Sequence, residues 1–317
     1  MTTYKETNGT NIEILSEDPA NPVQGQIWYN TDSSTLKGLG YVATGAWATG
    51  GNLNTARAAT GGAGTQTAGL AFGGGYPAKA NTESYNGSSW TELNDLNTAR
   101  AELAGTGTQT AALAFGGYPV LSLTETWNGT NWTEVNNLNT GRDNVGSATA
   151  GTNTAALAFG GLSLTANTEL WNGTNWTEVN NLNTATRGIA GAGTSTSALS
   201  SGGANPGITA NTETWNGTNW TEVNNLNTAR RNPGGAGINN TSAIAYGGYS
   251  TAYIAITEEW NGTNWTEIAD LSTARSAASS IGSSAAALAG GGYNGSYLAT
   301  TEEWTGVGPA VQTFSDA

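Results

Sequence analysis

Short apolar runs and polar turns alternate along this chain, and the same pattern returns at a nearly constant spacing. Its marker is Leu-Asn-Thr-Ala-Arg with close variants, at residues 53–57, 96–100, 138–142, 182–187, 226–230 and 271–275. The steps from one Leu to the next are 43, 42, 44, 44 and 45 residues, and we interpret the fourth marker as one residue longer. No segment has apolar residues at the helical period, so we expect strands and no helices.

Each repeated unit contains the signals of four strands. In the second unit, the small residues 101–107 predict the first strand, and the apolar run 111–117, which ends in Gly-Gly, predicts the second. A Thr-Glu-x-Trp motif predicts the third strand and Trp-Thr-Glu-Val the fourth, with an Asn-Gly hairpin turn between them. Four strands in a repeat of about 40–50 residues are typical of a β-propeller. Small residues suit the innermost strand, where strands crowd around the axis.

The unit resembles a kelch repeat, with its double glycine, its aromatic third strand, its fourth-strand Trp and its Leu…Arg link to the next blade. The resemblance implies an all-β, kelch-type β-propeller of four-stranded antiparallel blades, in which the Arg is structural. We expect each Arg to bond to backbone or to pair with a third-strand Glu. The structural repeat residues are Arg57, Arg100, Arg142, Arg187, Arg230, Arg275, Trp90, Trp132, Trp176, Trp220 and Trp265.

The number of blades depends on how the ends of the chain are used. Six units are present, but the sixth lacks a fourth-strand Trp. If the strand around Trp47 supplies the missing strand, the propeller has six blades, which we favour. Alternatively, residues 310–314 fill that place, or join residues 26–30, 36–42 and 47–49 in a composite seventh blade. Either arrangement would remove open sheet edges.

The N-terminal region carries a second resemblance. Residues 18–32 read Asp-Pro-Ala-Asn-Pro-Val-Gln-Gly-Gln-Ile-Trp-Tyr-Asn-Thr-Asp, and Leu36-Lys37 and Trp47 follow. This stretch resembles a short segment common in structural proteins of tailed phages. It implies a virion protein. Because residues 1–21 are polar and include Glu6, Glu13 and Glu17, they do not form a secretory signal, and we expect synthesis in the host cytoplasm without a signal peptide. We therefore divide the chain into a polar arm, 1–24, and a propeller, 25–317, with closing strands in 25–52 and kelch-like repeats in 53–317.

Composition excludes several kinds of chemistry. The 317 residues include no Cys and no His, so disulfides, thiolate nucleophiles, His-dependent catalysis and Cys- or His-ligated metals are excluded. The net charge of −13 disfavours nucleic-acid binding, and no apolar run reaches the length of about 18 residues of a membrane span. Twelve Trp and 11 Tyr argue against disorder. We expect no enzyme activity, cofactor, metal, nucleic acid or membrane insertion.

The loop between the second and third strands is the part of the unit that varies most. In an up-and-down blade, these loops all emerge on one face. Divergent, Tyr-rich loops on a uniform scaffold are typical of recognition surfaces. The alternative is that the loops drift without function and their tyrosines only cover the rim of the core. The candidate binding residues are Tyr76, Tyr118, Tyr249, Tyr253, Tyr293 and Tyr297.

These observations predict a non-enzymatic virion structural protein of a tailed phage, displayed as a tail fibre or adhesin that binds a host-surface glycan or protein. One alternative is a capsid or tail decoration protein whose partners are other virion proteins; a homo-oligomer on the particle stays open in both cases. A third hypothesis, a polysaccharide-cleaving enzyme, needs two nonrepeated carboxylates in one pocket. The nonrepeated carboxylates are Glu102, Asp143, Asp95, Asp270, Glu259 and Glu303.

Overall fold

The chain folds into two compact units that contain only strands, turns and loops in their described parts. The computed structural model describes residues 12–19, 26–41, 45–162, 164–306 and 309–314. One unit is Ala46–Thr305, and the other combines Met1–Gly45 with Gly306–Ala317. The units therefore divide the chain after residue 45 and again after residue 305, whereas the sequence placed a single boundary after residue 24.

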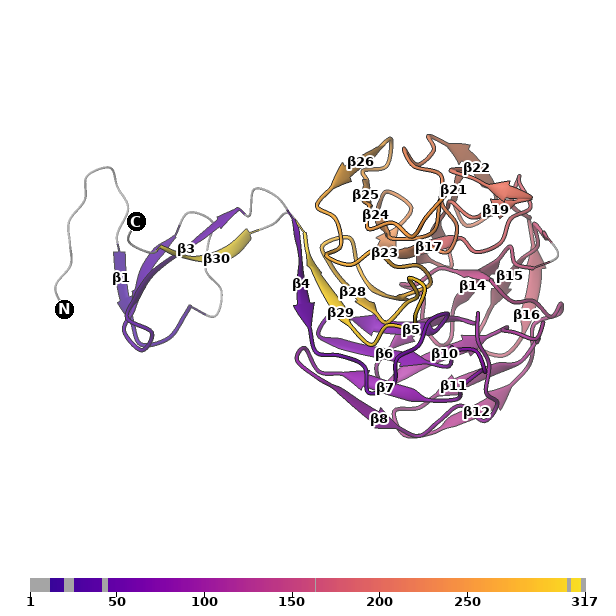
Figure 1. Ribbon diagram of the computed structural model, residues 1–317, viewed down its shortest axis with the longest axis horizontal. Coiled ribbons are helices and arrows are strands. Elements are labelled where there is room, and N and C mark those ends of the chain that lie inside the picture. Colours follow the sequence, from indigo (N-terminus) through magenta and orange to yellow (C-terminus); the bar gives the residue numbers. More distant parts are fainter. Residues whose placement is uncertain (1–11, 20–25, 42–44, 163, 307–308, 315–317) are drawn as a thin grey trace. The chain divides into compact units, whose positions relative to one another are not determined.

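The unit Ala46–Thr305 contains six four-stranded antiparallel sheets, which we number 1 to 6 in chain order (Figure 1). Sheets 1 to 3 are β5 (Gly61–Thr65), β6 (Ala68–Phe72), β7 (Thr82–Tyr85) and β8 (Trp90–Leu93); β9 (Ala104–Thr108), β10 (Ala111–Phe115), β11 (Thr124–Trp127) and β12 (Trp132–Val135); and β13 (Gly146–Ser147), β14 (Ala156–Phe159), β15 (Thr168–Trp171) and β16 (Trp176–Val179). These strands occupy the places that the repeat predicts.

The second half of the ring continues the pattern. Sheets 4 to 6 are β17 (Ala190–Thr194), β18 (Ser197–Ser201), β21 (Thr212–Trp215) and β22 (Trp220–Val223); β23 (Gly234–Asn239), β24 (Ser242–Tyr246), β25 (Thr257–Trp260) and β26 (Trp265–Ile268); and β27 (Ser279–Gly282), β28 (Ala286–Gly290), β29 (Thr301–Thr305) and β4 (Ala46–Gly50). Two short strands, β19 (Ala204–Asn205) and β20 (Gly207–Ile208), pair within the loop of sheet 4. The sixth sheet is completed by β4, in which Trp47 lies opposite Trp304, as expected for the strand around Trp47.

A seventh four-stranded sheet, the terminal sheet, belongs to the other unit. It contains β1 (Ile12–Leu15), β2 (Ile27–Asn30), β3 (Thr35–Tyr41) and β30 (Pro309–Phe314). β1 runs parallel to β2, and the other pairs are antiparallel. The count of four-stranded sheets is thus seven, as in the predicted alternative with a composite of both chain ends. The composition of that sheet was partly wrong, because residues 47–49 belong to sheet 6 and β1 takes the fourth place.

Six backbone hydrogen bonds link the repeat sheets into a closed cycle. They join one residue per sheet, located two positions after the repeat Arg or, in sheet 4, two positions after Thr186; we call these residues the axial positions. Glu102 N donates to Ala59 O at 2.8 Å, and Asn144 N donates to Glu102 O at 3.0 Å. The full cycle of axial positions is Ala59, Glu102, Asn144, Gly188, Asn232 and Ala277. All six have φ between 50° and 60°, so the left-handed conformation is a property of the scaffold.

Each fourth-strand Trp connects its sheet to the preceding one. Trp132 Nε1 donates to Thr82 Oγ1 at 2.9 Å, and its ring packs edge-on against Phe72 with centroids 4.9 Å apart. The other pairs are Trp90–Thr301, Trp176–Thr124, Trp220–Thr168, Trp265–Thr212 and Trp47–Thr257. Since Trp90 of sheet 1 reaches Thr301 of sheet 6, these contacts also continue around the whole ring.

The inner strands carry small residues because neighbouring sheets approach too closely for side chains. A Cβ on Gly191 of sheet 4 would lie 2.0 Å from Ser147 O of sheet 3, and a Cβ on Gly105 of sheet 2 would lie 2.7 Å from Gly62 O of sheet 1. Such contacts are far below van der Waals distance, so the backbone itself forms the wall around the axis. This explains the Ala/Gly-rich first strand of the repeat.

Five of the six repeat arginines are buried and paired with a third-strand Glu. Arg142 Nη2 lies 2.8 Å from Glu169 Oε1, and its Nη1 donates to Asn167 O at 2.7 Å. The second oxygen of Glu169 accepts the backbone N–H of Asn139 at 2.8 Å, so one carboxylate holds both the Arg and the incoming link. Burial lowers the pKa of the Arg142 guanidinium, and attraction to Glu169 opposes this shift. The other pairs are Arg57–Glu83, Arg100–Glu125, Arg230–Glu258 and Arg275–Glu302.

Arg187 does not occupy the repeat position, and its assignment as a structural Arg was wrong. The fourth marker is not longer than the others, because the buried Thr186 lies four residues after Leu182, where the other sheets have Arg. Arg187 comes one place later and is only partly buried. Glu213, which lacks an Arg partner here, accepts the backbone N–H of Thr184 at 3.0 Å. The same backbone bond accompanies the ion pair in sheets 1, 5 and 6, so sheet 4 keeps the bond to the link and lacks the ion pair.

The turn between the third and fourth strands is formed by the Asn-Gly-Thr-Asn segment. Four residues connect β11 to β12, and only Gly129 among them has a positive φ, of 90°. Asn128 Oδ1 accepts the backbone N–H groups of Thr130 and Asn131, each at 2.9 Å. Asn therefore serves here as a side-chain acceptor that closes the turn, and Gly supplies the left-handed step.

Candidate functional site

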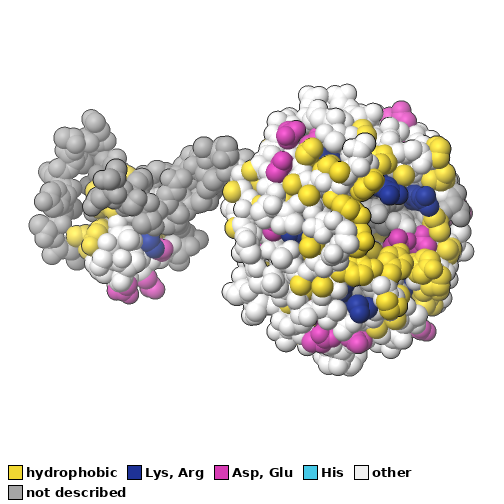
Figure 2. Space-filling view, in the orientation of Figure 1, with side chains coloured by type: hydrophobic (Ala, Val, Ile, Leu, Met, Phe, Trp, Pro, Cys, Tyr) yellow, Lys and Arg dark blue, Asp and Glu magenta, His cyan; other side chains and the backbone are white. Residues whose placement is uncertain are grey.

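A cavity of about 490 Å³ opens along the axis of the ring. Its walls include inner-strand residues from five of the six sheets, sheet 5 contributing the residues just before its inner strand, and all six axial positions line it. Figure 2 shows this hollow near the centre of the ring, with Lys or Arg atoms on one rim and Asp or Glu atoms close below them. Because the walls are built from rigid repeat backbone, the cavity is preformed. Preformed concave sites of this size are where ligands usually bind.

The six tyrosines predicted as candidates come together on one face as a continuous tyrosine arc. Neighbouring rings meet edge-on: centroid distances are 5.2 Å for Tyr249–Tyr253, 5.6 Å for Tyr253–Tyr293, 5.4 Å for Tyr293–Tyr297 and 5.4 Å for Tyr76–Tyr118. Tyr76 N donates to Tyr297 Oη at 2.9 Å, which joins the two runs. Five of these tyrosines line the cavity; Tyr118 lies behind Tyr76.

The tyrosine arc stays partly open to solvent. Tyr76 and Tyr118 are each 44% exposed, and the other four are intermediate between buried and exposed. The arc arises from sheets 5, 6, 1 and 2, whereas the corresponding loops of sheets 3 and 4 contain no Tyr. One side of the cavity mouth is therefore aromatic and the other is not.

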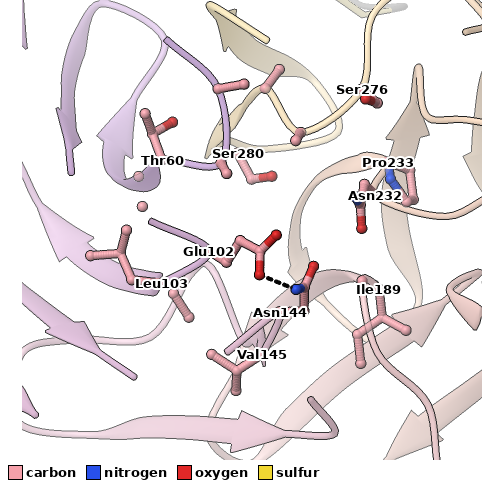
Figure 3. Close-up of a pocket in the computed structure, with 18 of the residues that line it drawn as sticks. Thr60, Glu102, Leu103, Asn144, Val145, Ile189, Asn232, Pro233, Ser276 and Ser280 are labelled. Carbon is pink, nitrogen blue, oxygen red and sulfur yellow. Dashed lines mark hydrogen bonds between the residues drawn. The ribbon is translucent and has the colours of Figure 1, made fainter. Parts of the chain in front are cut away.

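The other side carries polar and charged residues at positions where the repeat diverges. The axial positions of sheets 2, 3 and 5 are Glu102, Asn144 and Asn232, whereas sheets 1 and 6 have Ala59 and Ala277. In Figure 3, Glu102 and Asn144 lie together within the cavity, with Asn232 on another part of its wall. The scaffold thus turns one variable position per sheet toward the same space, and polar side chains occupy it in sheets 2, 3 and 5.

Glu102 lies at the centre of a small network. Its carboxylate accepts a hydrogen bond from Asn144 Nδ2 and interacts with the Tyr76 hydroxyl. Burial raises the pKa of Glu102, and nearby Asp143 adds to this, whereas Tyr76 and Arg187 oppose it. Burial also raises the pKa of Tyr76, and Glu102 adds to that shift. The network links the aromatic side of the mouth to the polar side.

The nonrepeated carboxylates are only partly brought together. Glu102 lines the cavity, whereas Asp143 is fully buried behind the wall, and burial raises its pKa. Asp95 accepts the N–H of Thr82 at 3.3 Å. Asp270 accepts the corresponding N–H of Thr257 at 3.0 Å in sheet 5, whereas sheets 2 to 4 use Asn for this bond. Glu303 accepts a hydrogen bond from the Tyr85 hydroxyl. Burial raises the pKa of Glu259. None of these last four lines the cavity.

Sequence reasoning missed three residues of the site: Asn144, Arg231 and Asn232. Each lies one or two positions after the repeat Arg or its equivalent, where the six units read Ala-Ala, Ala-Glu, Asp-Asn, Arg-Gly, Arg-Asn and Ser-Ala. Comparing these two positions across the six units shows the divergence directly. The signal was therefore present, but it lay outside the loops that vary most in length.

Within the described residues, no helix is long and apolar enough to cross a membrane. The same part of the chain shows no group of three or more Asp or Glu side chains arranged to hold a metal ion.

Comparison with known proteins supports the fold alone. No family model matches this sequence, and no curated protein matches it. Among solved structures, the fold is similar to that described as "Structure of YjhT", with a TM-score of 0.64 and 14% sequence identity. The match covers 80% of this chain and 95% of that one. It agrees with repeated four-stranded blades of a β-propeller.

Proposed function

We propose that this protein is a non-catalytic, saccharide-binding adhesin of kelch type, carried on the particle of a tailed phage. The observation that carries the proposal is the tyrosine arc at the mouth of the preformed cavity. All six divergent tyrosines meet there, although they come from four separate loops. Tyrosine offers a broad apolar face together with a hydroxyl, which suits the C–H faces and hydroxyl groups of sugars.

The polar half of the cavity supports a sugar ligand further. Glu102, Asn144 and Asn232 together offer hydrogen-bond acceptors and amide donors next to the arc. A saccharide needs both kinds of partner, because its hydroxyls both donate and accept. A single cavity binds weakly, and several copies on one particle raise the overall affinity through multivalency.

The carboxylates favour binding over cleavage. Glycoside cleavage needs two carboxyl groups that flank the scissile bond. Among the carboxylates of the described residues, only Glu102 lines the cavity, and Asp143 is buried at 0% exposure. We therefore retain the non-enzymatic function and treat hydrolysis as an outcome of the test below.

Attachment to the particle is assigned to the terminal sheet, on the strength of the phage-like segment. Asp18 accepts hydrogen bonds from Trp28 Nε1 at 3.0 Å, Asn30 Nδ2 at 2.7 Å and Lys37 Nζ at 2.8 Å. These four residues belong to the stretch that carries the resemblance. Their shared cluster supplies a structural reason for the motif, because one carboxylate ties the incoming chain to β2 and β3.

The test is binding of the isolated full chain to an array of bacterial surface glycans and other oligosaccharides. Tyr253→Ala and Tyr297→Ala should each weaken binding at least about tenfold, as expected for central aromatic contacts. Tyr29→Ala is the matched control, since Tyr29 is 36% exposed and lies in the terminal sheet. It should leave binding unchanged.

Other outcomes separate the alternatives. Binding to emptied phage particles without any glycan binding would favour a decoration protein. Shortening of a bound oligosaccharide, followed by mass spectrometry and abolished by Glu102→Gln, would favour an enzyme. Equal glycan binding by the Tyr253 and Tyr29 variants would reject the tyrosine arc as the binding site.

A further inference from the structure

The arginines of this chain fall into two groups. Five of the seven are held in buried ion pairs with glutamates. The remaining two, Arg187 and Arg231, take part in no ion pair within the described part of the chain. Both immediately precede an axial position, in sheets 4 and 5. In a chain with a net charge of −13, two such cations in adjacent sheets are a candidate for binding an anion.

Both arginines line the same recess, which adjoins the axial cavity. The recess has a volume of about 170 Å³ and is lined by Glu102, Asn144, Arg187, Ala204, Arg231 and Asn232. Four of these residues, Glu102, Asn144, Arg231 and Asn232, also line the main cavity, so a ligand in the cavity can extend into the recess. Its lining includes residues of sheets 3 and 4, whose loops carry no Tyr.

The two arginines are positioned by their surroundings. The Arg231 guanidinium lies 4.9 Å from the ring centroid of Tyr249, the first residue of the tyrosine arc. Backbone hydrogen bonds of 2.9 and 2.8 Å connect the same two residues. Arg187 is bonded through its backbone to Ala204 in the same way, at 3.4 and 3.0 Å. Stacking on an aromatic face leaves the guanidinium edge free to donate hydrogen bonds.

Small residues shape the space between the arginines. Gly188 is the only glycine among the axial positions, and a Cβ there would lie 2.1 Å from Asn232 Oδ1. The side chain of Asn232 therefore uses the room that Gly188 leaves. Glu102 also lines the recess, where it accepts the amide of Asn144, and attraction to Arg187 lowers its pKa against the effect of burial. The recess thus combines two guanidinium groups with one carboxylate and two amide groups.

We propose that the recess binds the anionic group of an acidic saccharide, with Arg187 and Arg231 as its partners. This rests on the proposed saccharide function and specifies its ligand class. The planar guanidinium groups would donate paired hydrogen bonds to a carboxylate, sulfate or phosphate on the sugar. Glu102 and the two asparagines would bond to hydroxyl groups of the same unit, while the tyrosine arc packs against its apolar face.

The experiment uses the full chain on an array that presents neutral, carboxylated, sulfated and phosphorylated oligosaccharides. Affinities for the oligosaccharides that bind are then measured by titration calorimetry. Oligogalacturonate and its carboxyl-reduced counterpart are measured in the same way as a matched acidic and neutral pair. Hits should be acidic, and Arg187→Gln and Arg231→Gln should each weaken them about tenfold or more, as expected for bonds to a charged group. Lys79→Gln is the control, because it removes a cation that lines neither hollow.

The outcomes distinguish this inference from the proposed function. Neutral hits, or acidic hits that bind both Arg variants as tightly as the wild type, overturn the anionic subsite and leave the saccharide function standing. The absence of any saccharide hit overturns both. Whether the acidic oligosaccharides that bind are carboxylated, sulfated or phosphorylated identifies the anionic group that the recess accepts. Both Arg variants should melt close to the wild type, since neither residue is part of a buried ion pair, and Arg231 is exposed.

Discussion

Breaking one buried ion pair should destabilise the ring strongly. Arg142→Met keeps most of the side-chain volume but leaves Glu169, 1% exposed, without its cation. Removing one partner of a buried pair costs about 3–5 kcal/mol, because the remaining charge is uncompensated. At about 2–4 °C per kcal/mol for a domain of this size, the melting temperature should fall by about 10 °C. Circular dichroism during heating, with urea titration, measures both quantities.

The double variant Arg142→Met/Glu169→Gln isolates the pair from other effects. It should lose about 2 kcal/mol less than the sum of the single variants, because no charge is stranded. Glu213→Gln in sheet 4 is a natural reference, since Glu213 has no Arg partner, and should cost about 1 kcal/mol for weakened hydrogen bonds. If Arg142→Met melted within about 2 °C of the wild type, the ion pairs would not hold the ring.

Three further predictions concern single sites. Burial raises the pKa of Glu102 above 4.5, so the folded state binds its proton more tightly than the unfolded state does. The free energy of unfolding should therefore fall as the pH rises from 4.5 through the pKa of the folded state. The Glu102→Gln variant should lose this part of the pH dependence and should melt at a higher temperature than the wild type near neutral pH. Trp176→Phe, which strands the Thr124 hydroxyl, should cost about 1–2 kcal/mol by urea titration. Gly173→Ala, at a φ of 90°, should cost about 1 kcal/mol in the same assay, and no loss would contradict the turn geometry.

The repeat pattern was sufficient to predict the strands and the origin of the last one. The order of the strands within a sheet follows from the hairpin turns, because each turn joins two strands that are adjacent in sequence. The same order then holds for every repeat of the unit. The pairing of Trp47 with Trp304 also followed, because an aromatic residue was missing from the sixth unit. The terminal sheet was harder to predict, since its parallel pair β1–β2 brings in residues 12–15 that carry no repeat signal.

The candidate site was only half predictable. The tyrosines were visible because they stand in loops that differ between units, and the ring brings those loops to one face. The axial positions were not visible, because their meaning depends on a left-handed backbone step that only the closed ring reveals. Arg187 was misassigned for a related reason: it was matched by residue type, whereas the fold aligns Thr186 with the other arginines.

The most direct test of the central claim is a crystal structure of the full chain with an oligosaccharide selected on the array. The account predicts the sugar in the axial cavity, with its face against the tyrosine arc and hydrogen bonds to Glu102, Asn144 or Asn232. A sugar bound on the outer strands or on the terminal sheet, with the cavity empty, would contradict it.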